Sequence, residues 1–261
     1  MATTLPDSPT KTVIARVPFL NSAPFFHGLI LDPSWEWLDV SPRQLGEQAA
    51  QGKLLAGPMA LADFLRLQGQ YERLGNLGIA VRGRCGSVLL LSRKPIRQLD
   101  EATIGVTEHT STSAVLLRLL LEQRYLLRPK IAPRGRIEDP DAVLVIGDEA
   151  LRMRAENRTY PYEIDLAFEW WLWQHLPAVF AVWSIRKDAA AEKPQILRLL
   201  QRQLAVNLAR LGDLATARSE SLDVPAADLT TYLENFVYRL SEPEEQAIAR
   251  FDQLVHDHDL L

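Results

Sequence analysis

Cysteine is almost absent from this chain. Cys85 is the only one among 261 residues, so the chain can form neither an internal disulfide nor a cysteine-rich metal cluster. This composition fits a reducing cytoplasm and argues against a small, disulfide-stabilised secreted domain. We expect Cys85 to be a small buried residue, and we expect no resident metal.

An excess of positive charge and long apolar runs are missing as well. The 29 lysines and arginines are outnumbered by 33 aspartates and glutamates, and the formal net charge of -4 does not favour a nucleic-acid surface. No apolar run approaches the roughly 20 residues of a membrane-spanning helix, and residues 1–11 lack the apolar core of a signal peptide. We therefore expect a cytoplasmic protein, monomeric or homodimeric, with neither a nucleic-acid nor a membrane partner.

What the sequence does contain is enough apolar residues for a large core. Hydrophobic residues make up 47% of a chain that is long enough for one large domain or for two lobes around a cleft. Strand-like stretches alternate with helix-like stretches of about 10 to 15 residues, which is typical of an α/β protein with mostly parallel sheets. These strands are expected at residues 12–17, 35–40, 54–59, 104–107 and 142–146.

Two further apolar runs interrupt this series. Residues 87–92 and 178–185 are nearly unbroken hydrophobic stretches, which suit strands buried on both faces or strands that cross between lobes. Interpreted as crossings, they predict that the chain leaves a first lobe and later returns to it. The expected lobes are residues 1–92 with 185–261, covered by the C-terminal helices, and residues 93–184.

Four consecutive hydroxyl residues lie where an expected strand is followed by a helix. Thr110, Ser111, Thr112 and Ser113 come after the strand at 104–107 and begin a helix with one apolar face. The unpaired N–H groups and the positive dipole end of a helix N-terminus favour an anion, and small hydroxyls add donors. Ordinary helix capping is the alternative, although one hydroxyl would suffice for it. We expect a carboxylate or phosphate site here.

Other polar or small residues lie at the ends of the remaining strands. Asn21 with Ser22 and Asp148 follow expected strands, Gly57 and Pro58 close the strand at 54–59, and Ser87 begins the apolar run at 87–92. The carboxyl ends of parallel strands gather along one edge of a sheet, so all of these residues except Ser87 are expected at one cleft with the hydroxyl run, and Ser87 is expected to face the same cleft. Asn21 and Asp148 also have an ordinary alternative as helix caps.

Five segments taken together resemble the chorismate dehydratase family of the futalosine route to menaquinone. In chain order they are V-P-F-L-N-S-A-P-F, G-P-M-A-L-A-D-F, T-S-T-S-A-V-L-L, V-L-V-I-G-D-E-A-L and L-P-A-V-F-A-V-W, within a resemblance that runs from about residue 12 to residue 260. The resemblance implies the fold of type II periplasmic solute-binding proteins, in which two crossing strands join two α/β lobes around a central ligand cleft. Relatives often carry an arginine within the hydroxyl run and Thr-Gly before the Leu-Pro, where this chain has Ser111 and Gln174-His175.

The resemblance also implies an activity and a set of site residues. The activity is dehydration of the dicarboxylate chorismate to 3-[(1-carboxyvinyl)oxy]benzoate by a carbon–oxygen lyase that needs no cofactor and no metal. The catalytic residues would be Asn21, Ser87 and Asp148, with Asp148 acting on the departing hydroxyl. The substrate-binding residues would be Ser22, Gly57, Pro58, Thr110, Ser111, Thr112 and Ser113. No protein base is evident, so a carboxylate of the substrate itself is expected to take the proton.

Two other functions stay open at this point. A sister enzyme of the same pathway, which acts on a cyclic futalosine to give 1,4-dihydroxy-6-naphthoate, shares the fold. A solute receptor for a transporter would use the same cleft only to bind, but such receptors normally carry an export signal or a lipid anchor, and none is visible in this sequence.

Overall fold

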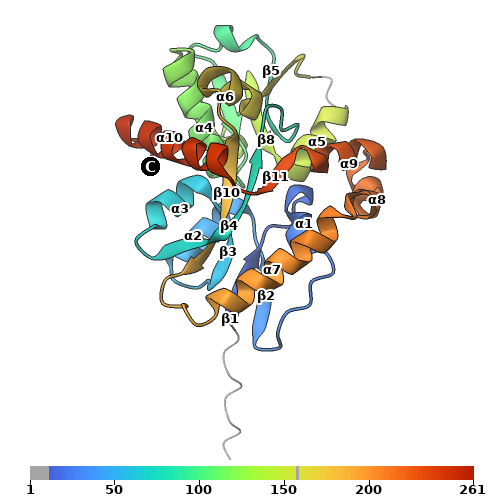
Figure 1. Cartoon of the computed structure of the whole chain (residues 1–261). Helices are drawn as coiled ribbons and strands as arrows, with labels where there is room; N and C mark the ends of the chain where they lie inside the picture. Colours follow the sequence, from blue (N-terminus) through green and yellow to red (C-terminus); the bar gives the residue numbers. More distant parts are fainter. Residues whose placement is uncertain (1–11, 157–158) are drawn as a thin grey trace, which may run out of the picture.

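The chain is built on two β-sheets, one in each of two lobes (Figure 1). The computed structural model describes residues 12–156 and 159–261. Lobe 1 contains a six-stranded sheet with the order β11-β4-β10-β3-β1-β2, and lobe 2 contains a five-stranded sheet with the order β7-β6-β8-β5-β9. The predicted α/β class is therefore confirmed.

Parallel and antiparallel pairs are mixed in lobe 1. β1 pairs in parallel with β2 and β3, whereas β10 is antiparallel to β3 and β4, and β11 is antiparallel to β4. The strands are β1 (Thr12–Arg16), β2 (Trp35–Asp39), β3 (Ala56–Ala60), β4 (Tyr71–Val81), β10 (Ala178–Arg186) and β11 (Phe236–Arg239). Because β1 and β3 run parallel, the segments that follow them reach the same edge of the sheet.

Lobe 2 repeats this arrangement with fewer strands. β6 pairs in parallel with β7 and β8, and β5 is antiparallel to β8 and β9. The strands are β5 (Val88–Ser92), β6 (Thr103–Val106), β7 (Lys130–Pro133), β8 (Ala142–Ile146) and β9 (Tyr162–Asp165). The carboxyl ends of β6 and β8 lead into the hydroxyl run and into Gly147-Asp148, which therefore lie at a common edge.

Helices flank both sheets and also lie at the waist of the molecule (Figure 1). In lobe 1 they are α1 (Ala23–Phe26), α2 (Pro42–Ala50), α3 (Leu61–Leu67) and α7 (Lys193–Leu208). In lobe 2 they are α4 (Thr112–Leu119) with a following π-helical turn (Leu120–Arg124), α5 (Gly147–Glu156) and α6 (Leu166–Gln174). The waist is formed by α8 (Leu211–Leu222), α9 (Ala226–Glu234) and α10 (Glu242–Asp257). Within the part of the chain that the structure describes, none of these helices combines the length and apolarity that crossing a membrane requires.

Two helices begin at capping boxes that the sequence makes recognisable. At α2, Ser41 Oγ accepts the N–H of Gln44 at 3.3 Å, and Gln44 Oε1 accepts the N–H of Ser41 at 2.9 Å. At α10, Ser241 and Glu244 form the equivalent pair, with a proline in the first turn of both helices. These reciprocal bonds satisfy N–H groups that the start of a helix leaves unpaired, so the expected helix starts are confirmed.

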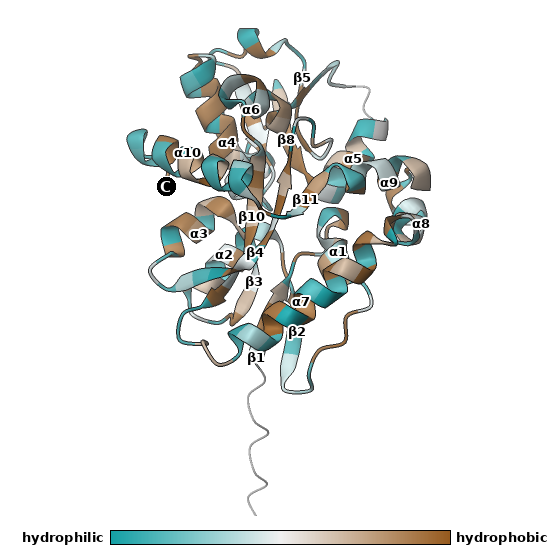
Figure 2. Ribbon diagram, in the orientation of Figure 1, coloured by the Kyte–Doolittle hydropathy of each residue, from teal (hydrophilic) through white to brown (hydrophobic). Residues whose placement is uncertain are grey.

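One hydrophobic core runs through both lobes. It includes Phe25 and Trp183 in lobe 1, whose rings meet edge to face at 5.6 Å, and Trp170 and Leu120 in lobe 2. Hydrophobic colours gather along the central strands, while the outward turns of α7 are hydrophilic (Figure 2). Because the core is continuous, the two lobes are packed firmly against each other.

Strand pairing moves both predicted lobe boundaries. The sequence pattern assigns residues 88–92 to lobe 1 and 178–184 to lobe 2, but β5 pairs with β8 and β9 in lobe 2, and β10 pairs with β3 and β4 in lobe 1. The chain crosses instead at residues 82–87 and 175–177. A continuous apolar run indicates burial on both faces of a sheet, and a central strand within one lobe meets that condition as well as a crossing strand does.

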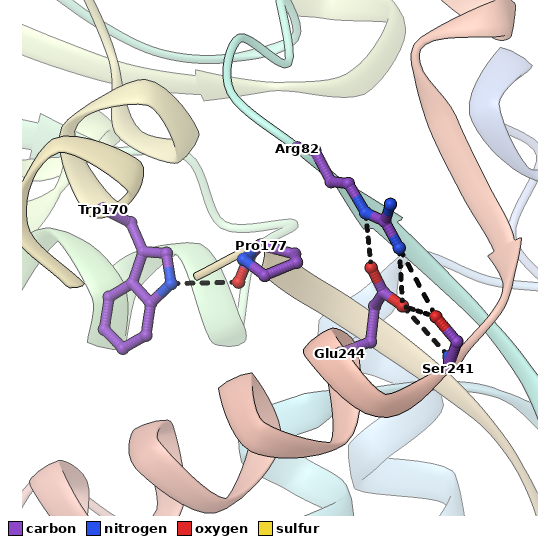
Figure 3. Close-up of polar contacts among 5 residues, drawn as sticks. All are labelled: Arg82, Trp170, Pro177, Ser241 and Glu244. Atoms are coloured by element: carbon purple, nitrogen blue, oxygen red, sulfur yellow. Dashed lines mark hydrogen bonds and ion pairs between the residues drawn. The ribbon is translucent and has the colours of Figure 1, made fainter. Parts of the chain in front are cut away.

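Side chains at the waist hold both crossings (Figure 3). Arg82 donates from Nε to Glu244 at 3.0 Å, and Glu244 also accepts the hydroxyl of Ser241 at 2.8 Å. Trp170 donates its indole N–H to the carbonyl of Pro177 at 3.0 Å. The first crossing is thus tied to α10, and the second is tied to α6.

Asp165 holds the first crossing from its other side. Its carboxylate accepts the N–H groups of Cys85 at 2.9 Å and Gly86 at 2.7 Å. The same carboxylate caps α6 through the N–H groups of Ala167 and Phe168. Burial raises the pKa of Asp165, although the four donors act in the opposite direction. Residues 85–86 are therefore part of the framework of lobe 2.

Candidate active site

A small cavity lies between the edges of the two sheets. Its volume is about 60 Å³, well below the roughly 300–1,000 Å³ of typical small-molecule pockets. Its polar wall consists of Asn21, Ser22, Thr110, Ser111, Thr112 and Ser113. Pro58 lines the cavity as well, so six of the seven residues predicted to bind substrate, and one of the three predicted to be catalytic, are brought together.

The opposite wall is apolar. It is formed mainly by Val17, Phe19, Ile79, Val88, Ile146 and Phe180. Among the described residues, no aspartate, glutamate, histidine, lysine, arginine, cysteine or tyrosine lines this cavity. Any bound acid would therefore be held by neutral donors and by the dipole of a helix rather than by a cationic side chain.

The start of α4 supplies most of these donors. Ser111 is the cap residue, but its side chain makes no capping hydrogen bond. Thr110 is only 6% exposed, and its Oγ1 is buried without a hydrogen-bond partner among the described residues. A buried hydroxyl without a partner is costly unless something else binds it. Thr110 and Ser111 therefore remain available to a ligand, as an anion site at a helix N-terminus requires.

Thr112 has a different role within the same run. Its Oγ1 accepts the N–H of Ala62 at 3.1 Å and donates to the carbonyl of Phe180 at 3.1 Å. Both partners belong to lobe 1, so this hydroxyl links the start of α4 in lobe 2 to α3 and β10. Nearby, the N–H of Arg43 donates to the carbonyl of His109 at 3.2 Å, again from lobe 1 to lobe 2. This side of the cavity is therefore closed by main chain that is hydrogen-bonded across the lobes.

Asn21 faces the hydroxyl run from lobe 1. The segment after β1 forms a short 3-10 turn, Leu20–Ser22, and Asn21 lies in the middle of it. Its Oδ1 accepts the hydroxyl of Ser22 at 3.4 Å, and no acceptor for its amide N–H₂ occurs among the described residues. The amide can therefore donate into the cavity.

Ser87 lies behind the cavity rather than in its wall. Its hydroxyl is fully buried, shares a 2.8 Å hydrogen bond with Tyr232 Oη and lies 3.4 Å from Cys85 Sγ. Burial raises the pKa of the Cys85 thiol to about 12 and that of the Tyr232 hydroxyl well above its usual value. The sequence predicts that Ser87 faces the cleft. In the structure its side chain is directed toward Tyr232 of α9 instead.

Asp148 also lies outside the cavity. Its Oδ1 accepts the N–H of Leu20 at 2.8 Å, and its other oxygen pairs with Arg218 of α8. Both partners come from outside lobe 2, so the carboxylate joins α5 to the segment after β1 and to the waist. The sequence predicts that this carboxylate contacts the ligand, whereas in the structure it is not part of the cavity wall and accepts hydrogen bonds from Leu20 and Arg218.

The two residues predicted at the end of β3 have separate positions. Pro58 lines the cavity, whereas Gly57 is packed inside the sheet. A Cβ at Gly57 would lie 2.9 Å from the Cβ of Ala15 on β1 and 3.2 Å from Leu45 of α2. Glycine is therefore required at position 57 for close packing, and it makes no wall of the cavity.

The sequence pattern does not indicate the apolar wall. Phe19 and Phe180 lie inside two of the five segments that carry the family resemblance, but their hydrophobicity indicates only burial. Gly147 carries a clearer signal, since it is a glycine that directly follows β8 and begins α5. Its backbone has φ +58°, and an added Cβ would lie 2.7 Å from the ring of Phe19.

The residues that the structure describes contain no group of three or more histidine, cysteine, aspartate or glutamate side chains able to hold a metal ion.

The fold and the cavity together define the class. This is a two-lobed α/β protein of the periplasmic-binding-protein type, with its candidate ligand site between the lobes, as the sequence predicts. A protein from Archaeoglobus fulgidus superimposes with a TM-score of 0.78 at 19% identity, covering 97% of this chain and 99% of that chain. The periplasmic aliphatic sulphonate binding protein SsuA from Escherichia coli gives a TM-score of 0.62 at 12% identity, covering 97% and 89%. At these identities the similarity shows the fold alone.

Sequence comparison is more specific. A family profile described as menaquinone biosynthesis matches residues 12–257. A chorismate dehydratase from Thermus thermophilus is 31% identical over 257 residues, covering 89% of this chain and 91% of that protein. The chain belongs to this menaquinone-biosynthesis family, and the resemblance inferred from five short segments is confirmed.

Proposed function

We propose that this protein is a chorismate dehydratase, a carbon–oxygen lyase that converts chorismate to 3-[(1-carboxyvinyl)oxy]benzoate and water in menaquinone biosynthesis. Family membership and the relative at 31% identity support the assignment. The structural observation that carries it is the pair of hydroxyls at the start of α4, Thr110 and Ser111, which line the cavity; Thr110 Oγ1 has no hydrogen-bond partner among the described residues, and Ser111 makes no capping bond. Such a set suits a carboxylate.

Carboxylate binding is assigned to both lobes. One carboxylate of the substrate is held by Thr110, Ser111 and the N-terminal N–H groups of α4, where the helix dipole favours negative charge. The Asn21 amide donates from lobe 1. Because the donors come from two lobes, bound substrate bridges them and stabilises their closed arrangement.

The reaction needs proton removal from C3 and loss of the hydroxyl from C4. The C3–H electron pair becomes the new ring double bond as the C4–O bond breaks, and the hydroxide leaves with the proton as water. Formation of the aromatic ring supplies the driving force. The protein's task is to fix geometry and to stabilise developing charge, and neutral donors in a closed site perform both.

The base in this scheme belongs to the substrate. No ionisable side chain lines the cavity among the described residues, so the wall offers no group that could take the C3 proton. The carboxylate of the enolpyruvyl ether is attached through the oxygen on C3 and can reach the C3 proton within the same molecule. Ser111 and Asn21 would orient that carboxylate, and the proton then passes to the departing hydroxide.

Ser87 and Asp148 act through other groups in this scheme. Ser87 fixes the first crossing against Tyr232, and Asp148 holds the segment that carries Asn21. They are positioning residues, whereas Asn21, Thr110 and Ser111 contact the substrate.

The proposal is tested by incubating the purified protein with chorismate and following the aromatic product by ultraviolet absorbance and by mass. The expected result is a product lighter than chorismate by one water. Binding of chorismate without turnover would support a receptor instead, and turnover of a cyclic futalosine alone would support the sister enzyme.

A further inference from the structure

Phe19 separates the cavity from the outside on one side of the molecule. Its half-buried ring lines the cavity and also two open hollows on the surface. The α8 hollow is lined by residues of the segment after β1 and of α8, including Leu214 and Arg218. The α5 hollow is lined by residues of the lobe 2 edge, including Arg134 and Arg152. Val17 is shared between the cavity and the α8 hollow, and Ile146 between the cavity and the α5 hollow. Among the described residues, Phe19 alone lines all three.

The opposite side of the cavity is closed differently. A third hollow, the α2–α3 hollow, shares Thr110 and Ser111 with the cavity. The segment that carries these two residues is held across the lobes by the bond from Arg43 to His109 and by the two bonds of Thr112. Three hydrogen bonds between the lobes would break if this side opened, whereas the other side is bordered by the apolar side chains of Val17, Phe19 and Ile146.

The ring of Phe19 has a defined seat. It packs on Gly147, where any Cβ would lie within 2.7 Å of the ring. The next residue, Leu20, donates its N–H to Asp148, whose carboxylate is also paired with Arg218. Asp148 therefore holds the backbone beside Phe19, while Gly147 provides the flat surface on which the ring closes.

Charge does not distinguish the two sides. The α8 and α5 hollows together present four arginines against three carboxylates, and Arg16 of the α8 hollow is already paired with Asp39. The α2–α3 hollow presents two arginines against two carboxylates. The position of Phe19 and its contact with Gly147 therefore carry the assignment.

We propose that Phe19 is the gate of the cavity. A dicarboxylate enters when the ring of Phe19 moves away from Gly147, and the hydrogen bond from Leu20 to Asp148 restrains the segment that carries the ring. The gate rests on the proposed function only for the identity of the molecule it admits.

The test measures access to the cavity without using turnover. Ala60 lines the cavity and is 3% exposed, so an Ala60→Cys probe in a Cys85→Ala background carries its one thiol inside. Alkylation of this thiol by iodoacetamide follows the fraction of open molecules. We expect Phe19→Ala to raise the alkylation rate roughly tenfold or more, and Gly147→Ala to raise it in the same direction.

The matched control truncates an apolar side chain at the other mouth. Leu67 lines the α2–α3 hollow, and Leu67→Ala should leave the alkylation rate unchanged. Thermal melts followed by circular dichroism show whether each variant is folded, and Phe19→Leu replaces Phe19→Ala if the latter unfolds. An unchanged rate in folded Phe19 variants, or an equal rise in Leu67→Ala, would overturn the gate. If the parent protein does not turn over chorismate, the proposed function is overturned, but the gate is not.

Discussion

The carboxylate of Asp148 accepts the backbone N–H of Leu20 at 2.8 Å, across the boundary between the lobes. Because this bond fixes the residue between Phe19 and Asn21, one carboxylate outside the cavity positions both an apolar and a polar part of its wall. Arg218 occupies the other oxygen, which leaves little capacity for a substrate hydroxyl.

The first prediction concerns this pair. Asp148→Asn and Arg218→Met should each lower kcat/KM for chorismate about tenfold, equivalent to about 1.4 kcal/mol. Since both act through one contact, the double variant should be little worse than either single variant. If the losses in kcat/KM of the two single variants add up in the double variant, Asp148 acts independently of Arg218, as a group acting on the departing hydroxyl would.

A second prediction concerns Asn21, whose amide donates into the cavity. Asn21→Ala should lower kcat by about 10²-fold, the usual cost of one well-placed donor. Its free energy of unfolding should stay close to that of the parent, because within the described part of the chain the side chain makes a single long hydrogen bond, to Ser22. Asn235→Ala, at an exposed position at the end of α9, is the matched control and should retain full activity. Full activity in Asn21→Ala would remove this residue from the site.

Thr110 should show opposite effects on stability and binding. Thr110→Val removes a buried hydroxyl that has no partner within the described protein, so the free energy of unfolding should stay level or rise by about 1 kcal/mol. Chorismate affinity should fall at least about tenfold, since a charge-assisted hydrogen bond is lost. Urea denaturation and equilibrium binding measure the two effects. Thr110→Ser keeps the hydroxyl and should bind like the parent; equal affinity of the valine variant would exclude Thr110 from carboxylate binding.

The buried thiol of Cys85 predicts a loss of stability at alkaline pH. Burial raises the pKa of Cys85 to about 12, above its ordinary value of 9.0, so the folded protein holds the proton more tightly than the unfolded chain. The stability contributed by the neutral thiol is complete below pH 9 and is lost as pH rises from there toward 12, at about 1.4 kcal/mol per pH unit. Unfolding by urea at pH 8 and pH 10 should therefore show a smaller loss for Cys85→Ala than for the parent. Equal losses in the two proteins would contradict the assignment of this pH dependence to Cys85.

A fifth prediction compares two neighbouring glutamates of α10. Glu244 is fully buried; burial alone would raise its pKa, but hydrogen bonds from Arg82 and Ser241 lower it below the ordinary value. Its contribution to stability is therefore present above about pH 4.5 and is lost as pH falls below that value. Glu244→Gln should cost about 1–2 kcal/mol at neutral pH, less than a fully buried pair because Arg82 is half exposed.

Glu245 provides the control for that change. It pairs with Arg73, but its own side chain is 42% exposed, so Glu245→Gln should cost less than about 1 kcal/mol. Chemical denaturation of both variants at pH 7 and pH 4 checks the order and the sign. If Glu244→Gln and Glu245→Gln lower the free energy of unfolding equally, the buried contact between Glu244 and Arg82 stabilises the protein no more than an exposed ion pair does.

The sequence by itself determined most of the local structure. Ser41-Pro42 and Ser241 with Glu244 carry the start signals of α2 and α10, and the strand expected at 142–146 coincides with β8. These features depend on residues close together in the chain, so their chemistry can be recognised without the fold. The hydroxyl run also began a helix as expected, since the strand before it and the apolar face after it are both local patterns.

Only the tertiary structure decided which lobe a doubly buried strand joins and which way a strand-end side chain points. Hydrophobic periodicity reports that β5 and β10 are buried, but burial does not name the partner strand. Likewise, Ser87 and Asp148 lie at strand ends as predicted, yet their side chains reach Tyr232, Leu20 and Arg218, far away in the sequence. Those contacts depend on how two lobes and a set of C-terminal helices pack together, and a through-space relationship of that kind leaves no local pattern in the chain.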